Sequence, residues 1–152
     1  MTQSLEAILG GHPFFKGLSK KHLKLIAGCA KNGRFSAGEQ IFLEGESADK
    51  FYFVEKGAVS IELTVPNKET TRVLKVGSGE ILGWSWLAPP FHWHFNARAL
   101  DATKAIVFDA KCLRGKCEVD HELGYEIFKR FATVIVERLD ATQVQLLDLY
   151  AK

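Results

Sequence analysis

Residues 38–45 read GEQIFLEG, residues 51–57 read FYFVEKG and residues 77–83 read GSGEILG. Each stretch is a short apolar run that begins or ends at a glycine. Because glycine lacks Cβ and adopts positive φ at little cost, these glycines favour tight turns between strands. Short strands separated by frequent turns are typical of a sandwich, a barrel or a roll.

The surrounding sequence extends this strand pattern over residues 34–109. The clearest strand is 59–65, in which every second residue is apolar, as expected for a strand with one buried face. Residues 71–76 are predicted to return as its hairpin partner, and residues 97–100 and 104–108 to form two closing strands. We therefore predict a mostly β fold, a double-stranded β-helix or jelly-roll-like β-roll.

Helices are predicted on both sides of the roll. Ser19 is a good N-cap for a short helix over residues 19–32, and Gly33 is placed to stop that helix. A long helix is predicted over residues 119–150, because Asp120 is able to cap it and no proline interrupts it. A helix of about thirty residues is ~45 Å long, which exceeds what a small roll can cover.

An apolar stripe runs along the predicted C-terminal helix. Its members alternate at spacings of three and four residues, which is the pattern of a coiled-coil seam. They are Ala132, Ile135, Leu139, Thr142, Leu146 and Leu149. One interpretation is a helix packed along its own roll. The favoured interpretation is the seam of a parallel homodimer, because a lone helix would leave its last turns exposed and apolar.

The length and composition fit one globular domain, residues 1–152. The net charge of +2 is too small to argue for nucleic-acid binding, and no apolar run approaches the ~20 residues that span a bilayer. The cysteine count of three is odd, and the N-terminus lacks the features of a secretory signal. Both observations favour reduced thiols and a cytoplasmic location.

The glycine-punctuated strands resemble the β-roll of the cyclic-nucleotide-binding domain family, which includes the catabolite activator protein and other Crp/Fnr-like regulators. The resemblance covers the chain from Phe14 to Tyr150 and implies a β-roll between a short N-terminal helix and a long C-terminal helix. The stretch GWSWL at 83–87, followed by Pro89 and Pro90, looks like the signature of a sub-family of short bacterial proteins of this fold.

The resemblance also implies a phosphate-binding cassette, in which a Glu holds the ribose hydroxyl and a later Arg holds the cyclic phosphate. Aligned by its glycines, this chain has Trp84 at the Glu position and Trp93 at the Arg position, with His94 at the small hydroxyl residue that follows. Arg98 falls on the strand that leaves the cassette and is expected to face outwards. One lost charged hydrogen bond costs about 1.5–3 kcal/mol, so a cyclic nucleotide is expected to bind weakly or by other contacts.

Five aromatic side chains crowd residues 84–95 of this predicted pocket. Three interpretations remain open. The rings fill the pocket as core, or they line a site for a flat or apolar ligand with Ser85, His92, His94 and Asn96 as polar anchors, or backbone amides at the cassette turn hold a nucleotide phosphate. The candidate pocket residues lie in the cassette and on the strand behind it: Gly83, Trp84, Ser85, Trp86, Trp93, His94, Phe95, Asn96 and Arg98.

Other chemistry is less well supported by the sequence. His92 and His94 could form a metal set with His121, Cys112 or Cys117, but ordinary surface or capping histidines are the favoured interpretation, so no metal site is predicted. A haem or redox sensor is a third alternative. No nucleophile–base arrangement, P-loop or paired carboxylate motif occurs, so no enzyme is predicted. The chain ends where transcription factors of the family begin a helix-turn-helix, so DNA binding by this chain alone is not expected.

The sequence thus predicts a non-enzymatic small-molecule sensor or regulatory domain. The resemblance implies that a ligand in the roll shifts the cassette turn and that the long helix reports the shift to a partner subunit. No cofactor is assigned. The alternative is a structural dimerisation or interaction module whose pocket is filled by aromatic rings.

Overall fold

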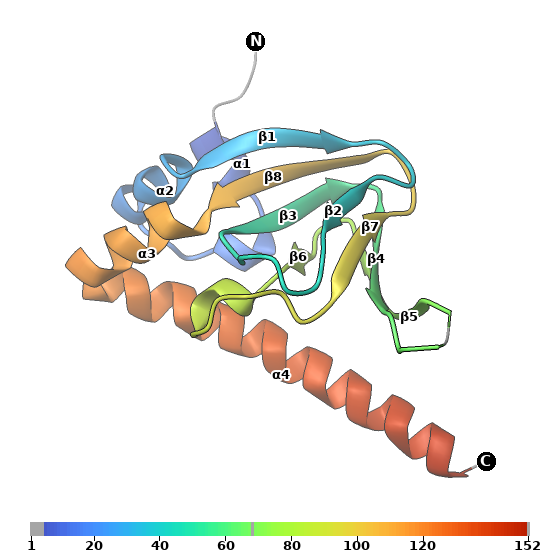
Figure 1. The fold of residues 1–152 in the computed structure, drawn as a ribbon. Coiled ribbons are helices and arrows are strands. Elements are labelled where there is room, and N and C mark those ends of the chain that lie inside the picture. The colour runs from blue at the N-terminus through green and yellow to red at the C-terminus, as the bar shows by residue number, and fades with distance from the viewer. Residues whose placement is uncertain (1–4, 68, 152) are drawn as a thin grey trace.

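The computed structural model describes residues 5–67 and 69–151. Within these residues, eight strands form two four-stranded antiparallel sheets that face each other as a roll (Figure 1). Sheet A has the strand order β1-β8-β3-β6, and sheet B has the order β2-β7-β4-β5. The strands are β1 (Ala30–Phe35), β2 (Gln40–Phe42), β3 (Lys50–Lys56), β4 (Ala58–Leu63), β5 (Thr71–Gly77), β6 (Ile81–Leu82), β7 (Asn96–Ala99) and β8 (Thr103–Asp109). The predicted fold class is confirmed.

Strand β4 corresponds to the strand predicted at 59–65. It lies between β5 and β7, and its antiparallel pairing with β5 makes the predicted hairpin with residues 71–76. Val59 and Ile61 are buried, as the alternation predicts. The polar residues Ser60 and Glu62, which alternate with them, are buried as well and accept hydrogen bonds from Arg72 and Arg98 of the neighbouring strands.

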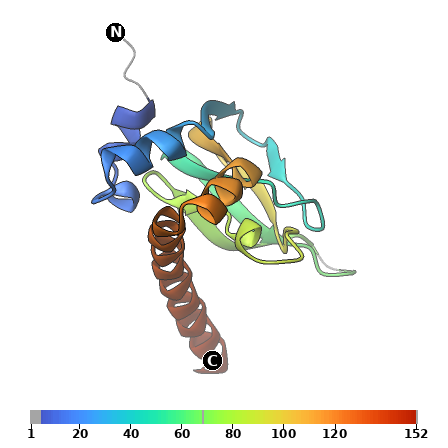
Figure 2. The ribbon, with the colours of Figure 1, turned by 90° about the vertical axis from the view of Figure 1, so that its left-hand side faces the viewer.

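Helical segments lie outside the two sheets (Figures 1 and 2). Phe14 on one of the N-terminal segments packs edge-on against Phe131 of the long C-terminal helix, with ring centroids 5.2 Å apart. The segments are α1 (Leu5–Gly10), η1 (Pro13–Phe15), α2 (Lys20–Ala27), η2 (Ser85–Leu87), α3 (Ala110–Val119) and α4 (His121–Ala151). The N-terminal segments therefore pack against the N-terminal half of α4.

An aromatic stack joins sheet A to these helices. The rings of Phe51 and Phe108, on neighbouring strands, stack with centroids 4.3 Å apart. Trp86 stacks on Phe51 at 4.9 Å, and Phe131 of α4 meets Phe51 edge-on at 5.1 Å. Phe15 packs on Phe108 from the N-terminal side. All five side chains are fully buried, so they hold the N-terminal half of α4 against the roll.

The N-terminal helix is shorter than the sequence predicts. Ser19 does cap it, since its hydroxyl accepts the N–H of His22 at 3.1 Å. However, α2 ends at Ala27 and Gly28 follows it, so the predicted extent of 19–32 is wrong. Gly33 is not a helix stop but lies in β1, where an added Cβ would come within 2.6 Å of Val107 Cγ2. Pairing of β1 with β8 therefore overrides the local helix signal.

The predicted C-terminal helix of 119–150 is also corrected. The chain forms α3 directly after β8, breaks at Asp120 and then forms α4. Asp120 accepts the N–H of Leu123 at 3.1 Å and so acts as the predicted cap. Sequence reasoning missed α3 because its apolar face is short and packs against α4 and the roll, which is a tertiary contact.

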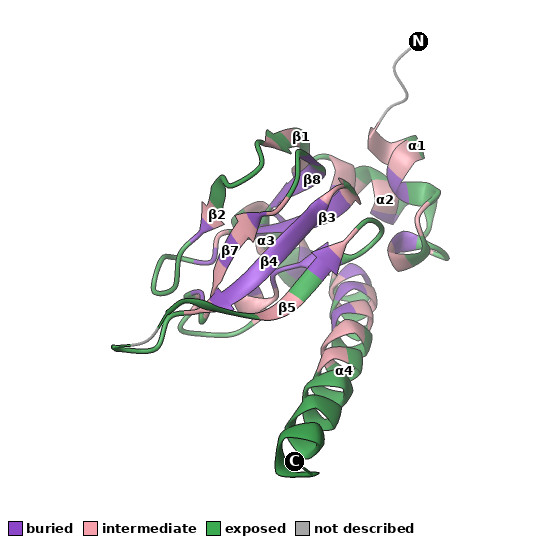
Figure 3. Cartoon of the chain, turned by 90° about the vertical axis from the view of Figure 1, so that its right-hand side faces the viewer, coloured by how far each residue is buried: buried purple, intermediate pink, exposed green. Residues whose placement is uncertain are grey.

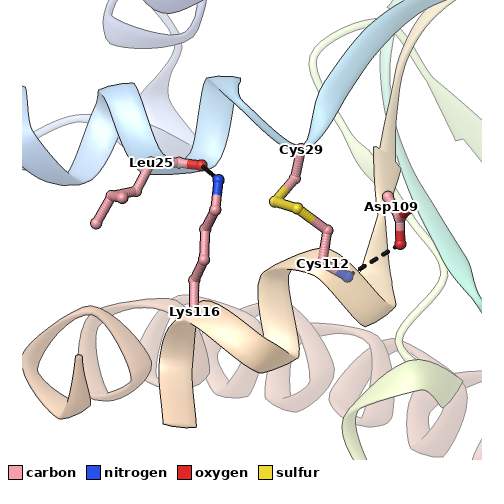
Figure 4. Close-up of a disulfide and its surroundings, with 5 residues drawn as sticks. All are labelled: Leu25, Cys29, Asp109, Cys112 and Lys116. Carbon is pink, nitrogen blue, oxygen red and sulfur yellow. Dashed lines mark hydrogen bonds between the residues drawn. A yellow bond between two sulfur atoms is a disulfide. The ribbon is translucent and has the colours of Figure 1, made fainter. Parts of the chain in front are cut away.

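Two of the three cysteines are joined. A disulfide links Cys29, between α2 and β1, to Cys112 in the first turn of α3 (Figure 4). Beside it, Lys116 Nζ donates to the carbonyl of Leu25 at 2.7 Å. Cys117 is free and buried. The expectation of reduced thiols is therefore wrong for Cys29 and Cys112, and it no longer supports a cytoplasmic location.

Helix α4 has two different halves. Its buried residues lie in the N-terminal half, whereas the residues from Leu139 to Ala151 are all exposed (Figure 3). No helix in the described part of the chain is long and apolar enough to cross a membrane. The exposed half includes the large apolar side chains Leu146 and Leu149, which are 51% and 71% exposed.

Candidate functional site

A cavity of about 520 Å³ lies between the roll and α4. Three groups of residues line it. The strands contribute the apolar side chains of Phe42, Ile61, Leu63, Val73, Leu74 and Leu82, and Phe95 adds another directly before β7. The cassette region contributes Gly83, Trp84, Ser85 and Trp93, and the helix contributes Ile135, Arg138, Leu139, Thr142 and Gln145.

Trp93 closes one side of this cavity. Its backbone forms two hydrogen bonds to the 45–46 segment: its N–H donates to the backbone carbonyl of Glu46 at 2.9 Å, and its carbonyl accepts the N–H of Gly45 at 2.8 Å. Its indole stacks on Phe42 with centroids 3.8 Å apart and planes 9° from parallel. The ring also lies against Gly83, where an added Cβ would approach Trp93 Cη2 to 2.7 Å. The indole thus occupies the space in front of the cassette glycine.

Trp84 and Arg138 form the opposite side of the cavity. Trp84 directly precedes η2, and the guanidinium carbon of Arg138 lies 4.8 Å from the centroid of its ring. Arg138 Nη2 also donates to the carbonyl of Ile81 in β6. Burial lowers the pKa of the Arg138 guanidinium below its usual value, and Glu80 and Glu137 act against that shift. This arginine therefore attaches α4 to the roll through a partly buried positive charge.

The polar groups of the cavity are concentrated on the helix. Four lining side chains are polar: Ser85, Arg138, Thr142 and Gln145. Three of these four belong to α4, whereas the strands contribute only apolar side chains. Thr142 is already engaged, because its hydroxyl donates to the carbonyl of Arg138 at 2.8 Å. A ligand in this cavity would meet an apolar roll on one side and a polar helix on the other.

The structure brings together five of the predicted pocket residues. Gly83, Trp84, Ser85, Trp93 and Phe95 all line the cavity. The remaining four predicted residues lie outside the cavity lining.

Trp86 is fully buried in the aromatic stack, and His94 is exposed away from the cavity lining. Asn96 uses its side-chain oxygen to accept the N–H of Glu44 at 2.8 Å. Arg98 lies on the outer face of sheet B and contacts both carboxylate oxygens of Glu62 at 2.8 Å. Its outward orientation agrees with the sequence-based expectation, but its place in the candidate pocket does not.

Sequence reasoning missed Arg138 and most of the strand residues of the cavity. The strand residues belong to the alternation already noted, so their inward face was predictable but their closeness to α4 was not. Arg138 stands directly before Leu139 in the predicted seam. The sequence signal that could have identified Arg138 is a basic residue next to the apolar stripe.

The predicted seam is divided between two surroundings. Ile135, Leu139 and Thr142 line the cavity, whereas Leu146 and Leu149 are exposed and lie outside the cavity lining. Helix α4 thus packs on its own roll over part of the stripe and leaves the rest of it uncovered.

No metal-binding cluster is found in the described residues: nowhere do three or more His, Cys, Asp or Glu side chains group in a way that could hold an ion.

The chain was compared with known proteins. The family model of the cyclic nucleotide-binding domain matches residues 33–120, which is more than half of the chain. The CRP-like cAMP-activated global transcriptional regulator of Mycobacterium tuberculosis is 22% identical over 95% of this chain and 63% of its own length. The type II regulatory subunit of cAMP-dependent protein kinase from Drosophila melanogaster is 28% identical over 51% of this chain and 20% of its own length. The chain thus spans less than two thirds of either relative.

A solved structure resembles the whole fold. A Geobacter metallireducens protein described as cyclic nucleotide-binding superposes with a TM-score of 0.80 at 28% identity, covering 91% of this chain and 99% of its own. Together with the two sheets and the cassette turn, these matches show that the chain belongs to the cyclic nucleotide-binding domain family.

Proposed function

We propose that this chain is a non-enzymatic regulatory domain that binds a small molecule between the β-roll and α4. The observation that carries the proposal is the cavity of about 520 Å³, which falls within the range of about 300–1,000 Å³ typical of small-molecule sites. One wall of the cavity is the helix itself. A ligand that fills it therefore contacts both the rigid roll and the element able to transmit a change.

The response would be a shift in the position of α4. The N-terminal half of the helix is held by buried aromatic residues, while the half beyond Arg138 is exposed. A ligand changes this equilibrium only if it binds one helix position more tightly than another. Ligand contacts with Ile135, Arg138 and Leu139 supply such a difference, because those side chains move with the helix.

Cyclic nucleotides are expected to bind weakly, and not through the contacts usual in the family. The aligned positions of the ribose Glu and the phosphate Arg are Trp84 and Trp93. Each lost charged hydrogen-bonding partner costs about 1.5–3 kcal/mol, so two losses lower affinity by roughly two to four decades. The indole of Trp93 also fills space beside Gly83.

The output would pass to a second copy of the chain. The exposed apolar stripe on the last turns of α4, which includes Leu146 and Leu149, supports a parallel helix seam between two protomers. The competing function is a structural dimerisation module with a filled roll. The stacking of Trp93 on Phe42 favours that alternative locally, but the open cavity beside them favours the sensor.

A binding assay combined with hydrogen exchange tests the proposal. Cyclic AMP, cyclic GMP, cyclic dinucleotides and simple apolar probes are titrated by calorimetry, and amide exchange of residues 135–151 is measured with and without each binder. A binder should slow exchange in this segment. In the matched variant Val73→Trp, a ring is added on the cavity wall of β5, and both effects should disappear. Unchanged exchange at saturation, or full binding by Val73→Trp, would contradict the proposal.

A further inference from the structure

We infer that the ligand of this cavity is an amphipathic anion, whose charged group binds the Arg138 guanidinium and whose apolar body lies in the roll. This inference rests on the proposed function, because it names the class of molecule that the same cavity takes. The charged end would face α4 at the point where Arg138 lies over the ring of Trp84.

The apolar body follows from the lining of the roll. Every strand residue that faces the cavity is apolar. A polar group placed there would lose its hydrogen bonds to water without replacement, which costs about 1–3 kcal/mol per group. Aliphatic or aromatic bodies avoid this loss, whereas a sugar with several hydroxyl groups does not.

The charged end follows from the bonding of Arg138. Two other arginines of this chain contact carboxylates, Arg98 with Glu62 at 2.8 Å and Arg130 with Glu126. Within residues 5–67 and 69–151, Arg138 forms no such ion pair, and its guanidinium contacts the carbonyl of Ile81 and the ring face of Trp84. A guanidinium has five N–H donors, so most of its donors are free for a ligand. Burial also lowers the pKa of this group, which is the effect expected of a cation that lacks a close partner.

The neighbouring charges favour an anion with a single negative charge over a dianion. Glu80 and Glu137 lie near enough to Arg138 to affect its pKa, yet neither forms an ion pair with it. Their negative charge would repel a dianion more than a monoanion. Ser85 and Gln145 are additional hydrogen-bonding side chains at the same opening. A monocarboxylate on an alkyl or aryl body fits all of these features.

The site also explains how binding would affect α4. Arg138 is the side chain that ties the helix to β6 through the carbonyl of Ile81. An anion bound to the same guanidinium would either strengthen this hydrogen bond or compete with it. In both cases, the charge of the ligand acts on the residue that joins α4 to the roll.

Three probes with the same body and different heads test the inference. Octanoate, 1-octanol and octylammonium are titrated by calorimetry and by tryptophan fluorescence, which reads the cavity directly through Trp84 and Trp93. Cyclic AMP and adenosine form a second pair, which differ by the anionic phosphate. The variants are Arg138→Gln and Arg138→Lys, with Arg130→Gln as the matched control on the same helix, since Arg130 contacts Glu126 and lies outside the cavity lining.

We expect octanoate to bind at least ~10-fold more tightly than octanol, and octylammonium to bind more weakly than either. Arg138→Gln should weaken octanoate by ~10- to 100-fold and change octanol by less than about twofold, which also shows that the variant cavity is folded. Arg138→Lys should recover part of the loss, and Arg130→Gln should resemble the unmodified protein. A further supporting result is that cyclic AMP binds, that adenosine does not, and that Arg138→Gln abolishes this difference in affinity. The anion that Arg138 contacts would then be the phosphate of a nucleotide.

Equal binding of octanoate and octanol would overturn the inference while leaving the proposed function intact, because the cavity would still take ligands. Charge-dependent binding that survives Arg138→Gln would overturn it as well, since the charged group would then lie elsewhere. If none of the five molecules binds, the inferred ligand class is wrong and the proposed function loses its support too.

Discussion

Reduction of the disulfide between Cys29 and Cys112 should destabilise the protein strongly. The two cysteines are 83 residues apart, so the bond closes most of the roll into one loop. In the chain-entropy model, a loop of 83 residues removes about 15 cal/mol/K from the unfolded chain, which corresponds to about 4.5 kcal/mol at 25 °C. For a protein of this size, that loss lowers the melting temperature by roughly 9–18 °C.

The measurement is urea unfolding of the oxidised protein, the reduced protein and the double variant Cys29→Ala/Cys112→Ala. The reduced protein and the double variant should have similar stabilities, both about 3–5 kcal/mol below the oxidised protein. Burial raises the pKa of the Cys117 thiol to about 11, so it should alkylate slowly in the folded state. The protein should expose one reactive thiol when it is unfolded without reductant. It should expose three reactive thiols when it is unfolded with reductant.

The variant Cys117→Ala is the control, because it removes the free thiol and leaves the disulfide in place. Its stability should still fall on reduction by about the same amount as that of the unmodified protein. Two results would refute the reasoning. One is a stability change on reduction of less than ~1 kcal/mol, and the other is three reactive thiols in the unfolded protein before any reductant is added.

Three further predictions follow from single contacts. The pKa of Asp120 is lowered, mainly by the hydrogen bond from the N–H of Leu123. The stability that this carboxylate contributes is therefore present above about pH 4 and is lost as the pH falls below that value. Between pH 5 and pH 2, the melting temperature of Asp120→Asn should decrease less than that of the unmodified protein. Gly83 has φ of 95° and lies against Trp93, so Gly83→Ala should destabilise by at least ~1 kcal/mol and shift the tryptophan emission, whereas an unchanged spectrum would contradict the packing. Leu146→Glu places a charge on the exposed stripe of α4, so sedimentation should show a homodimer of the unmodified protein converted to monomer; a monomeric unmodified protein would refute the seam.

Much of the fold was predictable from local patterns. The alternation in residues 59–65 identified β4, and the hairpin with β5 followed from the next apolar run. The caps at Ser19 and Asp120 were also predictable, because a cap is a contact between residues three apart. The end of α2 and the presence of α3 were not, because both depend on pairing and packing with distant residues.

The candidate site was only half predictable. Five cassette and strand residues from Gly83 to Phe95 were placed in the pocket by their similarity to a known pattern, and the structure finds them lining one cavity. Trp86 was wrongly assigned to the pocket, because the sequence of several nearby aromatic residues does not show which of them face the cavity and which face the core. Its stacking on Phe51 places it in the core, and that contact joins residues far apart in the chain.

The sequence by itself determined the roll, since strand alternation and glycine turns act between near neighbours. Only the tertiary structure decided that Trp86 is buried against Phe51, that Cys29 meets Cys112, and that Arg138 lies without an ion-pair partner beside an apolar cavity. The reason is physical. Backbone conformation follows from residues a few positions apart, whereas burial, pairing and an unmet charge depend on which distant surfaces come together when the chain closes.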